Sequence, residues 1–209
     1  MTTNASGASE AARLEELWQG DFGRQYVERN RRAGASRGPF WSGLVNRLSP
    51  GRVLEVGCNV GANLQHLVVA PGVDDVWGVD VNRESLAELR ARLPQVSAGW
   101  AVARNLPFRD GWFDLVLTVA VLIHVPEDAL PLAMQELVRC SARHVLCMEY
   151  RADKTEEVEY RGQRRAFFKR DYGSILAGLF PELTLVEEGD IGKADGFDDG
   201  LGYWLLAKD

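Results

Sequence analysis

Apolar residues change their spacing along the chain near residue 52. Before that point, Leu14, Leu17 and Trp18 recur at helical spacing, and a second apolar helical stretch ending at Leu48 follows Pro39. Residues 1–8 are small and polar, so we expect them to be disordered and a helix to begin near Ser9. A short break at 20–23 separates the first helix from a polar one. Residues 9–50 therefore predict a helical cap.

From Arg52 onward, short apolar runs alternate with helical stretches. The runs RVLEV, VWGVD, GWAVA, FDLVLTVAVL and HVLCMEY predict five strands, and Pro126 opens a helix expected over 127–140. Strands that alternate with helices pair in parallel through right-handed crossovers. The pattern predicts an α/β domain with a doubly wound sheet.

The carboxyl-terminal third departs from this alternation. A polar insertion over 151–171 precedes the helix DYGSILAGLF, for which Asp171 is the expected cap. The strands LTLVEE and GYWLLAKD then follow without a helix between them. Two strands joined in this way either pair antiparallel or lie far apart in the sheet.

Composition places the chain among globular proteins with one domain. The 209 residues are 46% hydrophobic and 26% charged, with a net charge of −6 and a pI near 5.2. Such an acidic chain gives no indication of nucleic-acid binding. Its most basic stretch, Arg161 to Arg170, indicates either recognition of a small anion or a solvated surface.

Cysteines and apolar segments indicate the cellular setting. Cys58, Cys140 and Cys147 have neither a disulfide framework nor metal-ligand spacing, so we expect a reducing cytoplasm and no metal. The sequence lacks a signal-peptide core and any run of about 20 apolar residues, which predicts no membrane association. The spaced acids of EEGDIGKADGFDDG miss the EF-hand pattern, and a mobile loop is favoured over a calcium site.

The segment VLEVGCNVGANL joins a strand to a helix through a glycine turn. Gly57 and Gly61 allow the backbone to approach a ligand at a helix amino terminus. Asn59 replaces the middle glycine of a dinucleotide fingerprint, which weakens that interpretation. Asp80 ends the second strand, where it could bind ribose hydroxyls or cap the helix starting near Arg83.

Two segments carry a resemblance to a known family. ExGxNxG, beginning at Glu55, resembles motif I of the class I S-adenosylmethionine-dependent methyltransferases, and ARNLPFRDGWFDLV resembles the segment between their third and fourth strands. The resemblance covers Arg52 to about Asp209. It implies a seven-stranded, mostly parallel Rossmann-like sheet whose last strand is antiparallel. It also implies methyl transfer from S-adenosylmethionine, with S-adenosylhomocysteine as product.

The resemblance also implies a set of cofactor-binding residues. The glycine turn would lie under the methionine portion, Asp80 would bind ribose and Val81 would contact adenine. Val102 stands where many members have an acid, so residues just after it would replace that contact, and the end of the fourth strand should face the cofactor. Tyr26, Asn30 and Arg31 would close over the cofactor, or belong to a purely structural helix. The other candidates are Glu55, Gly57, Cys58 through its backbone, Asn59, Gly61, Ala103, Arg104, Asn105, Thr118, Val119 and Ala120.

Residues near the carboxyl ends of the fourth and fifth strands are candidates for acceptor chemistry. His124 could be a general base or could order the loop before Pro126. Glu149 and Tyr150 end the fifth strand and are further candidates, whereas Asp114 is expected to be structural. Five tryptophans are expected in the core: Trp18, Trp41, Trp100, Trp112 and Trp204. The insertion would bind the acceptor through Tyr160, Arg161, Arg165, Lys169 and Arg170, or form a solvated cap.

The substrate class follows from a finer resemblance. GDFGRQYVERN, VAVLIHVP and MEY followed by YRGQRRAFFKRDYG resemble small methylases linked to pseudaminic acid and other nonulosonate sugars. This implies a small anionic acceptor, either a sugar or a natural-product intermediate, bound by a monomer or homodimer. A nicotinamide-dependent oxidoreductase and a non-catalytic S-adenosylmethionine-binding protein remain alternatives.

Overall fold

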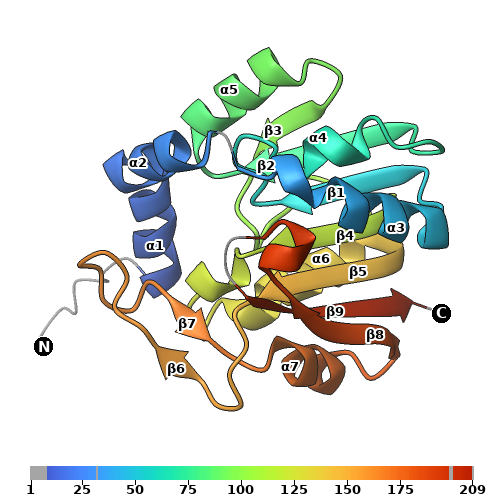
Figure 1. Ribbon diagram of the computed structural model, residues 1–209. Helices are drawn as coiled ribbons and strands as arrows, with labels where there is room; N and C mark the ends of the chain where they lie inside the picture. Colours follow the sequence, from blue (N-terminus) through green and yellow to red (C-terminus); the bar gives the residue numbers. More distant parts are fainter. Residues whose placement is uncertain (1–8, 32, 198–199, 209) are drawn as a thin grey trace, which may run out of the picture.

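One twisted sheet organises the molecule. The computed structural model describes residues 9–31, 33–197 and 200–208, within which seven strands pair in the order β3-β2-β1-β4-β5-β9-β8 (Figure 1). Only β9 runs antiparallel to its neighbours, β5 and β8. The predicted doubly wound sheet with an antiparallel last strand is therefore confirmed. The bounds are β1 Arg52–Val56, β2 Asp75–Asp80, β3 Ser97–Trp100, β4 Phe113–Val119, β5 Ser141–Glu149, β8 Leu183–Ile191 and β9 Leu201–Lys208.

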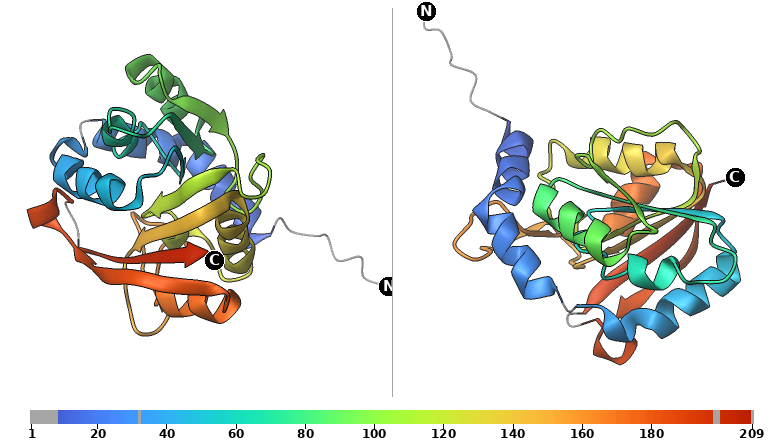
Figure 2. Two further views of the ribbon diagram at one scale, coloured as in Figure 1. Left: turned by 90° about the vertical axis from the view of Figure 1, so that its right-hand side faces the viewer. Right: turned by 90° about the horizontal axis from the view of Figure 1, so that it is seen from above.

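Helices cover both faces of this sheet (Figure 2). Apolar side chains of α3 Gly38–Leu48, α4 Leu64–Leu67 and α5 Arg83–Arg92 pack into one hydrophobic cluster. Those of α6 Leu130–Cys140 and α7 Tyr172–Leu179 pack into a second cluster. Trp41 and Trp204 are 0% and 1% exposed, as expected of core residues. The two hydrophobic clusters therefore pack on opposite faces of the sheet.

The amino-terminal helices and the insertion lie together at the carboxyl ends of the parallel strands. Here α1 Glu10–Gln19 stands beside the insertion that carries β6 Glu156–Glu157 and β7 Phe168–Lys169, and α2 Asp21–Asn30 continues from α1 towards α5 (Figure 1). The Arg13 guanidinium donates to the carbonyl oxygens of Arg164 and Arg165, 3.3 and 3.4 Å away. Both parts of the chain therefore cover the edge of the sheet where open α/β folds bind ligands.

Several predicted boundaries change in the structure. As expected, α1 begins next to Ser9, whose Oγ caps the helix by accepting from the Ala12 N–H, whereas the disorder expected over residues 1–8 lies outside the described residues. The break expected at 20–23 is Gly20 alone. The helix expected over 127–140 begins at Leu130, and β4 ends at Val119 because Ala120 has a φ of 55°.

Two other expectations also change. Residues 189–191, which follow the predicted strand LTLVEE and were expected in a mobile loop, extend β8, since this strand pairs with β9 over its length. Trp100 is 39% exposed, so its expected place in the core is wrong. The short helices η1 Ala35–Arg37, η2 Leu122–His124 and η3 Lys193–Asp195 complete the elements of the described chain.

Searches of the described residues for metal clusters and membrane spans found neither. No group of three or more histidine, cysteine, aspartate or glutamate side chains in this part of the chain could hold a metal ion. None of its helices is long and apolar enough to cross a membrane. Cys58, Cys140 and Cys147 are all free and buried.

Candidate functional site

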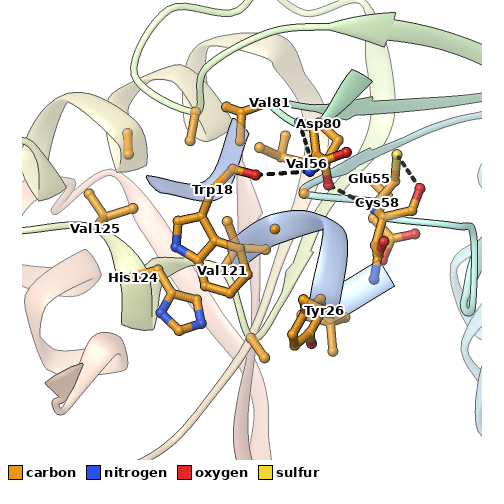
Figure 3. A pocket seen from close by; sticks show the side chains of 18 of the residues that line it. Trp18, Tyr26, Glu55, Val56, Cys58, Asp80, Val81, Val121, His124 and Val125 are labelled. Atoms are coloured by element: carbon orange, nitrogen blue, oxygen red, sulfur yellow. Dashed lines mark hydrogen bonds between the residues drawn. The ribbon is translucent and has the colours of Figure 1, made fainter. Parts of the chain in front are cut away.

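A pocket opens where the strand order reverses, between β1 and β4. The glycine turn after β1, the ends of β2 and β4 and the amino-terminal helices all contribute to its wall (Figure 3). Such a switch point is where doubly wound sheets bind ligands. Of the sequence-predicted residues, the structure brings together Tyr26, Asn30, Glu55, Gly57, Cys58, Asn59, Asp80, Val81, Ala103, Arg104, Val119, Ala120, His124 and Tyr150.

The glycine turn is held against the neighbouring strand. The backbone N–H groups of Gly57 and Cys58 donate to the Val79 carbonyl over 2.8 and 3.0 Å. Gly57 has a φ of 76°, and a Cβ added there would collide with the Val121 side chain. Glycine is therefore required by both conformation and space.

Gly61 serves packing rather than the pocket. Its φ is 82°, and a Cβ added there would collide with Leu89 of α5 and approach Leu93 to 3.0 Å. Gly61 does not line the pocket. Gly61, predicted to bind the cofactor, instead brings the glycine turn close to α5 in the structure.

Asp80 links the end of β2 to the glycine turn. Its Oδ2 accepts a hydrogen bond from the Asn59 N–H and its Oδ1 one from the Asn82 N–H, each over 2.8 Å. Burial raises the pKa of Asp80, an effect that these backbone donors oppose. Asn82 caps α5 by accepting from Glu84 N–H and Ser85 N–H, so the alternative assignment of Asp80 as the cap is wrong.

A chain of polar side chains runs from the floor of the pocket to η1. Asn63 donates to Glu55 Oε1 over 2.6 Å and accepts from Arg37 over 2.8 Å. The second carboxylate oxygen, Glu55 Oε2, is buried and has no hydrogen-bond partner among the described residues. Burial raises the pKa of Glu55 to about 8. A buried polar atom left in this state needs a hydrogen-bond partner from a ligand or from water.

His124 stands at the other end of the pocket (Figure 3). Its Nδ1 lies 2.6 Å from the Ala166 carbonyl oxygen, which can only accept, so Nδ1 carries the proton and Nε2 has a lone pair. Burial lowers the pKa of His124 to about 4. The imidazole is thus neutral at pH 7 and presents a hydrogen-bond acceptor.

Glu149 holds the loop that carries His124 rather than facing the pocket. Its Oε1 accepts from Thr118 Oγ1, Val121 N–H and Leu122 N–H, and its Oε2 accepts from Ile123 N–H, over 3.0 to 3.3 Å. Glu149 is 0% exposed, and burial raises its pKa to about 7. Neither Glu149 nor Thr118 lines the pocket, so both predicted assignments change to positioning of the loop.

The predicted cations and the remaining candidates lie outside the pocket lining. Arg170 is 2% exposed, donates to the Val125 carbonyl over 3.0 Å and lies over the Phe168 ring. Arg165 approaches Glu10 to 3.7 Å, and Arg31 pairs with Glu88 over 3.0 Å. These contacts hold segments of the chain together. Arg161, Lys169, Asn105 and Tyr160 also lie outside the lining, although the Tyr160 ring contacts that of His124 at a tilt, with centroids 5.5 Å apart.

Sequence reasoning missed several lining residues. Trp18, Arg37, Asn63 and Phe197 all contribute to the wall, as does Glu15, which forms a bidentate pair with Arg104 over 2.7 and 2.9 Å. The helical spacing of Trp18 resembled that of a core residue. Asn63 is the one that the sequence could have indicated, because it lies two residues after Gly61 of the glycine turn.

Comparison with known proteins agrees with this geometry. Residues 53–144 match the model of a family described as methyltransferase domain. A norajmaline N-methyltransferase of Rauvolfia serpentina is 30% identical over 99 residues, 44% of this chain and 33% of that protein. An uncharacterised protein of Haemophilus influenzae is 33% identical over 94 residues, 42% of this chain and 37% of that protein. The chain therefore spans about a third of the length of these curated relatives.

Solved structures share the fold across nearly the whole chain. A Burkholderia thailandensis 1,6-didemethyltoxoflavin-N1-methyltransferase with bound S-adenosylhomocysteine has a TM-score of 0.73 at 19% identity, covering 98% of this chain and 92% of its own. A Synechocystis magnesium protoporphyrin IX methyltransferase with bound S-adenosylmethionine has a TM-score of 0.69 at 15% identity, covering 99% and 100%. These likenesses show that the fold is the Rossmann-like methyltransferase fold.

Proposed function

We propose that this protein is an S-adenosylmethionine-dependent methyltransferase that acts on a small molecule. The observation that carries the proposal is the Asp80 carboxylate at the pocket, held by the Asn59 N–H of the glycine turn. The methyltransferase-domain match over residues 53–144 contains both residues. An acid at the end of β2 beside such a turn is suited to ribose hydroxyls.

The residues present fit S-adenosylmethionine. The unpartnered Glu55 Oε2 would pair with the ammonium of its methionine portion, whose positive charge would favour the ionised form of Glu55, and Asp80 would accept from its ribose. Val81 and Ala103 line the same wall and would contact the adenine. When bound, the cofactor supplies an activated methyl group on a sulfonium centre. No residue of the chain has to form a covalent intermediate.

The chain's own residues would orient the acceptor and exclude water. The pocket is covered by α1 and α2, since Arg104 pairs with Glu15 of α1 and Asn82 donates to the Trp18 carbonyl over 2.9 Å. His124 Nε2 would accept the hydrogen of the acceptor group, which orients that group and removes its hydration. Tyr150 lines the same pocket and is a further candidate for contact with the acceptor.

The finer expectations from the sequence belong to this proposal. A sugar or natural-product intermediate is the acceptor class that the pseudaminic-acid-associated resemblance implies, in a cytoplasmic monomer or homodimer. An anionic acceptor would depend on the cations of the insertion, and these lie outside the pocket lining. The observations therefore favour an acceptor recognised without those cations.

Calorimetric titration tests the proposed function. We expect saturable binding of S-adenosylmethionine and S-adenosylhomocysteine, and no heat of binding with NAD. Saturable binding of NAD alone would instead indicate the nicotinamide-dependent oxidoreductase. Binding of S-adenosylmethionine without methylation of any small molecule would favour the non-catalytic alternative.

A further inference from the structure

Aromatic rings from distant parts of the chain converge at the His124 end of the pocket. Trp18 of α1 has its ring centroid 4.4 Å from that of His124 and packs edge-on against Phe22 and Tyr26. Tyr160 of the insertion lies 5.5 Å from His124. Of these residues, Trp18, Tyr26 and His124 line the pocket. Flat rings arranged around a cavity favour a flat ligand, because stacked and edge-on contacts both require planar faces.

Phe167 is a further ring of this group. Tyr160 stacks on Phe167 at 5.4 Å with an interplanar angle of 30°, and Phe167 contacts both His124 and Tyr150. The chain thus places aromatic side chains from α1, α2, η2, the insertion and the end of β5 in one cluster. We call Trp18, Tyr26, His124 and Tyr150, the members that line the pocket, the aromatic wall.

The aromatic wall also offers one hydrogen-bond donor and one acceptor. The indole Nε1–H of Trp18 is buried and has no hydrogen-bond partner among the described residues. His124 has its Nδ1 proton committed to Ala166, which leaves Nε2 as an acceptor. Figure 3 shows the two rings next to each other in the pocket. A buried donor without a partner indicates that a ligand or water completes it.

The charges of the pocket do not favour an anion. Among the described lining residues, two are arginines, Arg37 and Arg104, and three carry carboxyl groups, Glu15, Glu55 and Asp80, of which Glu55 has its pKa raised to about 8 and is mostly neutral at pH 7. Arg104 is paired with Glu15 through both hydrogen bonds, and Arg37 donates to Asn63 and lies over the Phe197 ring. An anionic acceptor would therefore meet no excess of positive charge.

From these observations we infer that the methyl acceptor is a flat, uncharged heteroaromatic ring that carries both a ring N–H and a carbonyl oxygen. Its N–H donates to His124 Nε2 and its carbonyl accepts from Trp18 Nε1–H, so its edge meets these two rings. Its faces pack against the remaining members of the aromatic wall, Tyr26 and Tyr150. This inference rests on the proposed function, and it replaces the small anionic acceptor, a sugar or natural-product intermediate, that the sequence favoured.

Titration of the protein saturated with S-adenosylhomocysteine tests the inference. The probes are lumazine, a neutral bicyclic lactam, its N,N-dimethyl derivative, which lacks the lactam N–H groups, and N-acetylneuraminate, an anionic sugar. We expect lumazine to bind at least roughly tenfold more tightly than either other probe. Failure of lumazine to bind, or tighter binding of N-acetylneuraminate, overturns the inference.

Two variants assign the contacts. Trp18→Phe keeps a ring but removes the donor, and should weaken lumazine binding roughly tenfold. His124→Phe should remove the preference for lumazine over its dimethyl derivative. The matched control is Trp112→Phe, the same substitution outside the pocket lining, which should leave both affinities unchanged. Equal effects of Trp18→Phe and Trp112→Phe would contradict the assigned donor.

The S-adenosylhomocysteine titration separates the two proposals. Absence of S-adenosylhomocysteine binding by the unsubstituted protein contradicts the proposed function itself. Normal S-adenosylhomocysteine binding with no lumazine binding contradicts only the inferred acceptor class.

Discussion

The Nδ1 of His124 lies 2.6 Å from the carbonyl oxygen of Ala166, 42 residues further along the chain. This hydrogen bond joins the loop after β4 to the insertion that follows β5. It also selects the tautomer of His124, because a carbonyl accepts and cannot donate. The His124 end of the pocket is thereby built from two segments, which this contact and the hydrogen bond from Arg170 to the Val125 carbonyl hold together.

The lowered pKa of His124 makes the stability of the folded protein depend on pH. Its pKa is about 4 in the folded protein and 6.5 as the ordinary value, so the unfolded chain binds the proton more tightly. Stability is therefore lost as the pH falls from about 6.5 towards 4, by about 2 kcal/mol at pH 5. Urea unfolding at pH 7.5 and pH 5 measures this effect. Between these two pH values, the free energy of unfolding of His124→Phe should fall by about 2 kcal/mol less than that of the unsubstituted protein. An equally steep loss in the variant would contradict the burial of a neutral imidazole.

The Glu149 carboxylate should be essential to the loop after β4. The two carboxylate oxygens of Glu149 accept four hydrogen bonds, and Glu149→Gln leaves a single side-chain oxygen to accept them. The substitution also places an amide NH₂ group against backbone N–H groups. We expect a loss of about 1–3 kcal/mol in the free energy of unfolding, the scale of an unsatisfied buried group. Chemical denaturation measures it.

Glu157→Gln is the matched control for Glu149→Gln. Glu157 is exposed and accepts one backbone hydrogen bond, from Arg165 N–H over 2.9 Å. Its substitution should change stability by less than about 0.5 kcal/mol. Similar losses in both variants would show that the hydrogen bonds of Glu149 do not hold the loop.

Gly57 has a left-handed backbone conformation and leaves no room for a Cβ beside the Val121 side chain. Gly57→Ala places a Cβ against Val121, whereas Gly72→Ala, at a φ of 83°, has nothing within 4 Å of its Cβ. The backbone cost of about 1 kcal/mol is common to both variants. Gly57→Ala should therefore be the less stable protein in urea unfolding and should bind S-adenosylhomocysteine more weakly. Indistinguishable behaviour of the two variants would contradict the packing of the turn against the β4 loop.

Local sequence patterns were sufficient to predict the sheet and the cofactor side of the site. Alternating strands and helices define the parallel order, and the turn at Gly57 and the acid at Asp80 are set within their own segments. These features depend on neighbours along the chain or on adjacent strands. The prediction of a pocket at the carboxyl ends of the strands followed from that order.

The acceptor side depends on contacts between distant segments and was predicted less well. Trp18 lies on α1, and the contacts of α1 with α2 and with the insertion decide which side of this helix faces the pocket. The helical spacing of apolar residues does not specify that side. Arg170 resembled a binding cation, but its buried bonds to loop carbonyls make it structural. Glu149 resembled a base until the geometry showed both oxygens bonded to the loop.

The most direct test of the account is the affinity of Asp80 variants for S-adenosylhomocysteine, measured by calorimetry. Asp80→Ala should weaken binding by about 1–3 kcal/mol, since ribose hydroxyls would lose their buried acceptor. Asp114→Ala is the matched control, because Asp114 also accepts a backbone hydrogen bond, from Arg52 N–H over 2.8 Å, but lies outside the pocket lining. The account predicts a loss of affinity in Asp80→Ala alone. Unchanged affinity in a folded Asp80→Ala protein would contradict it.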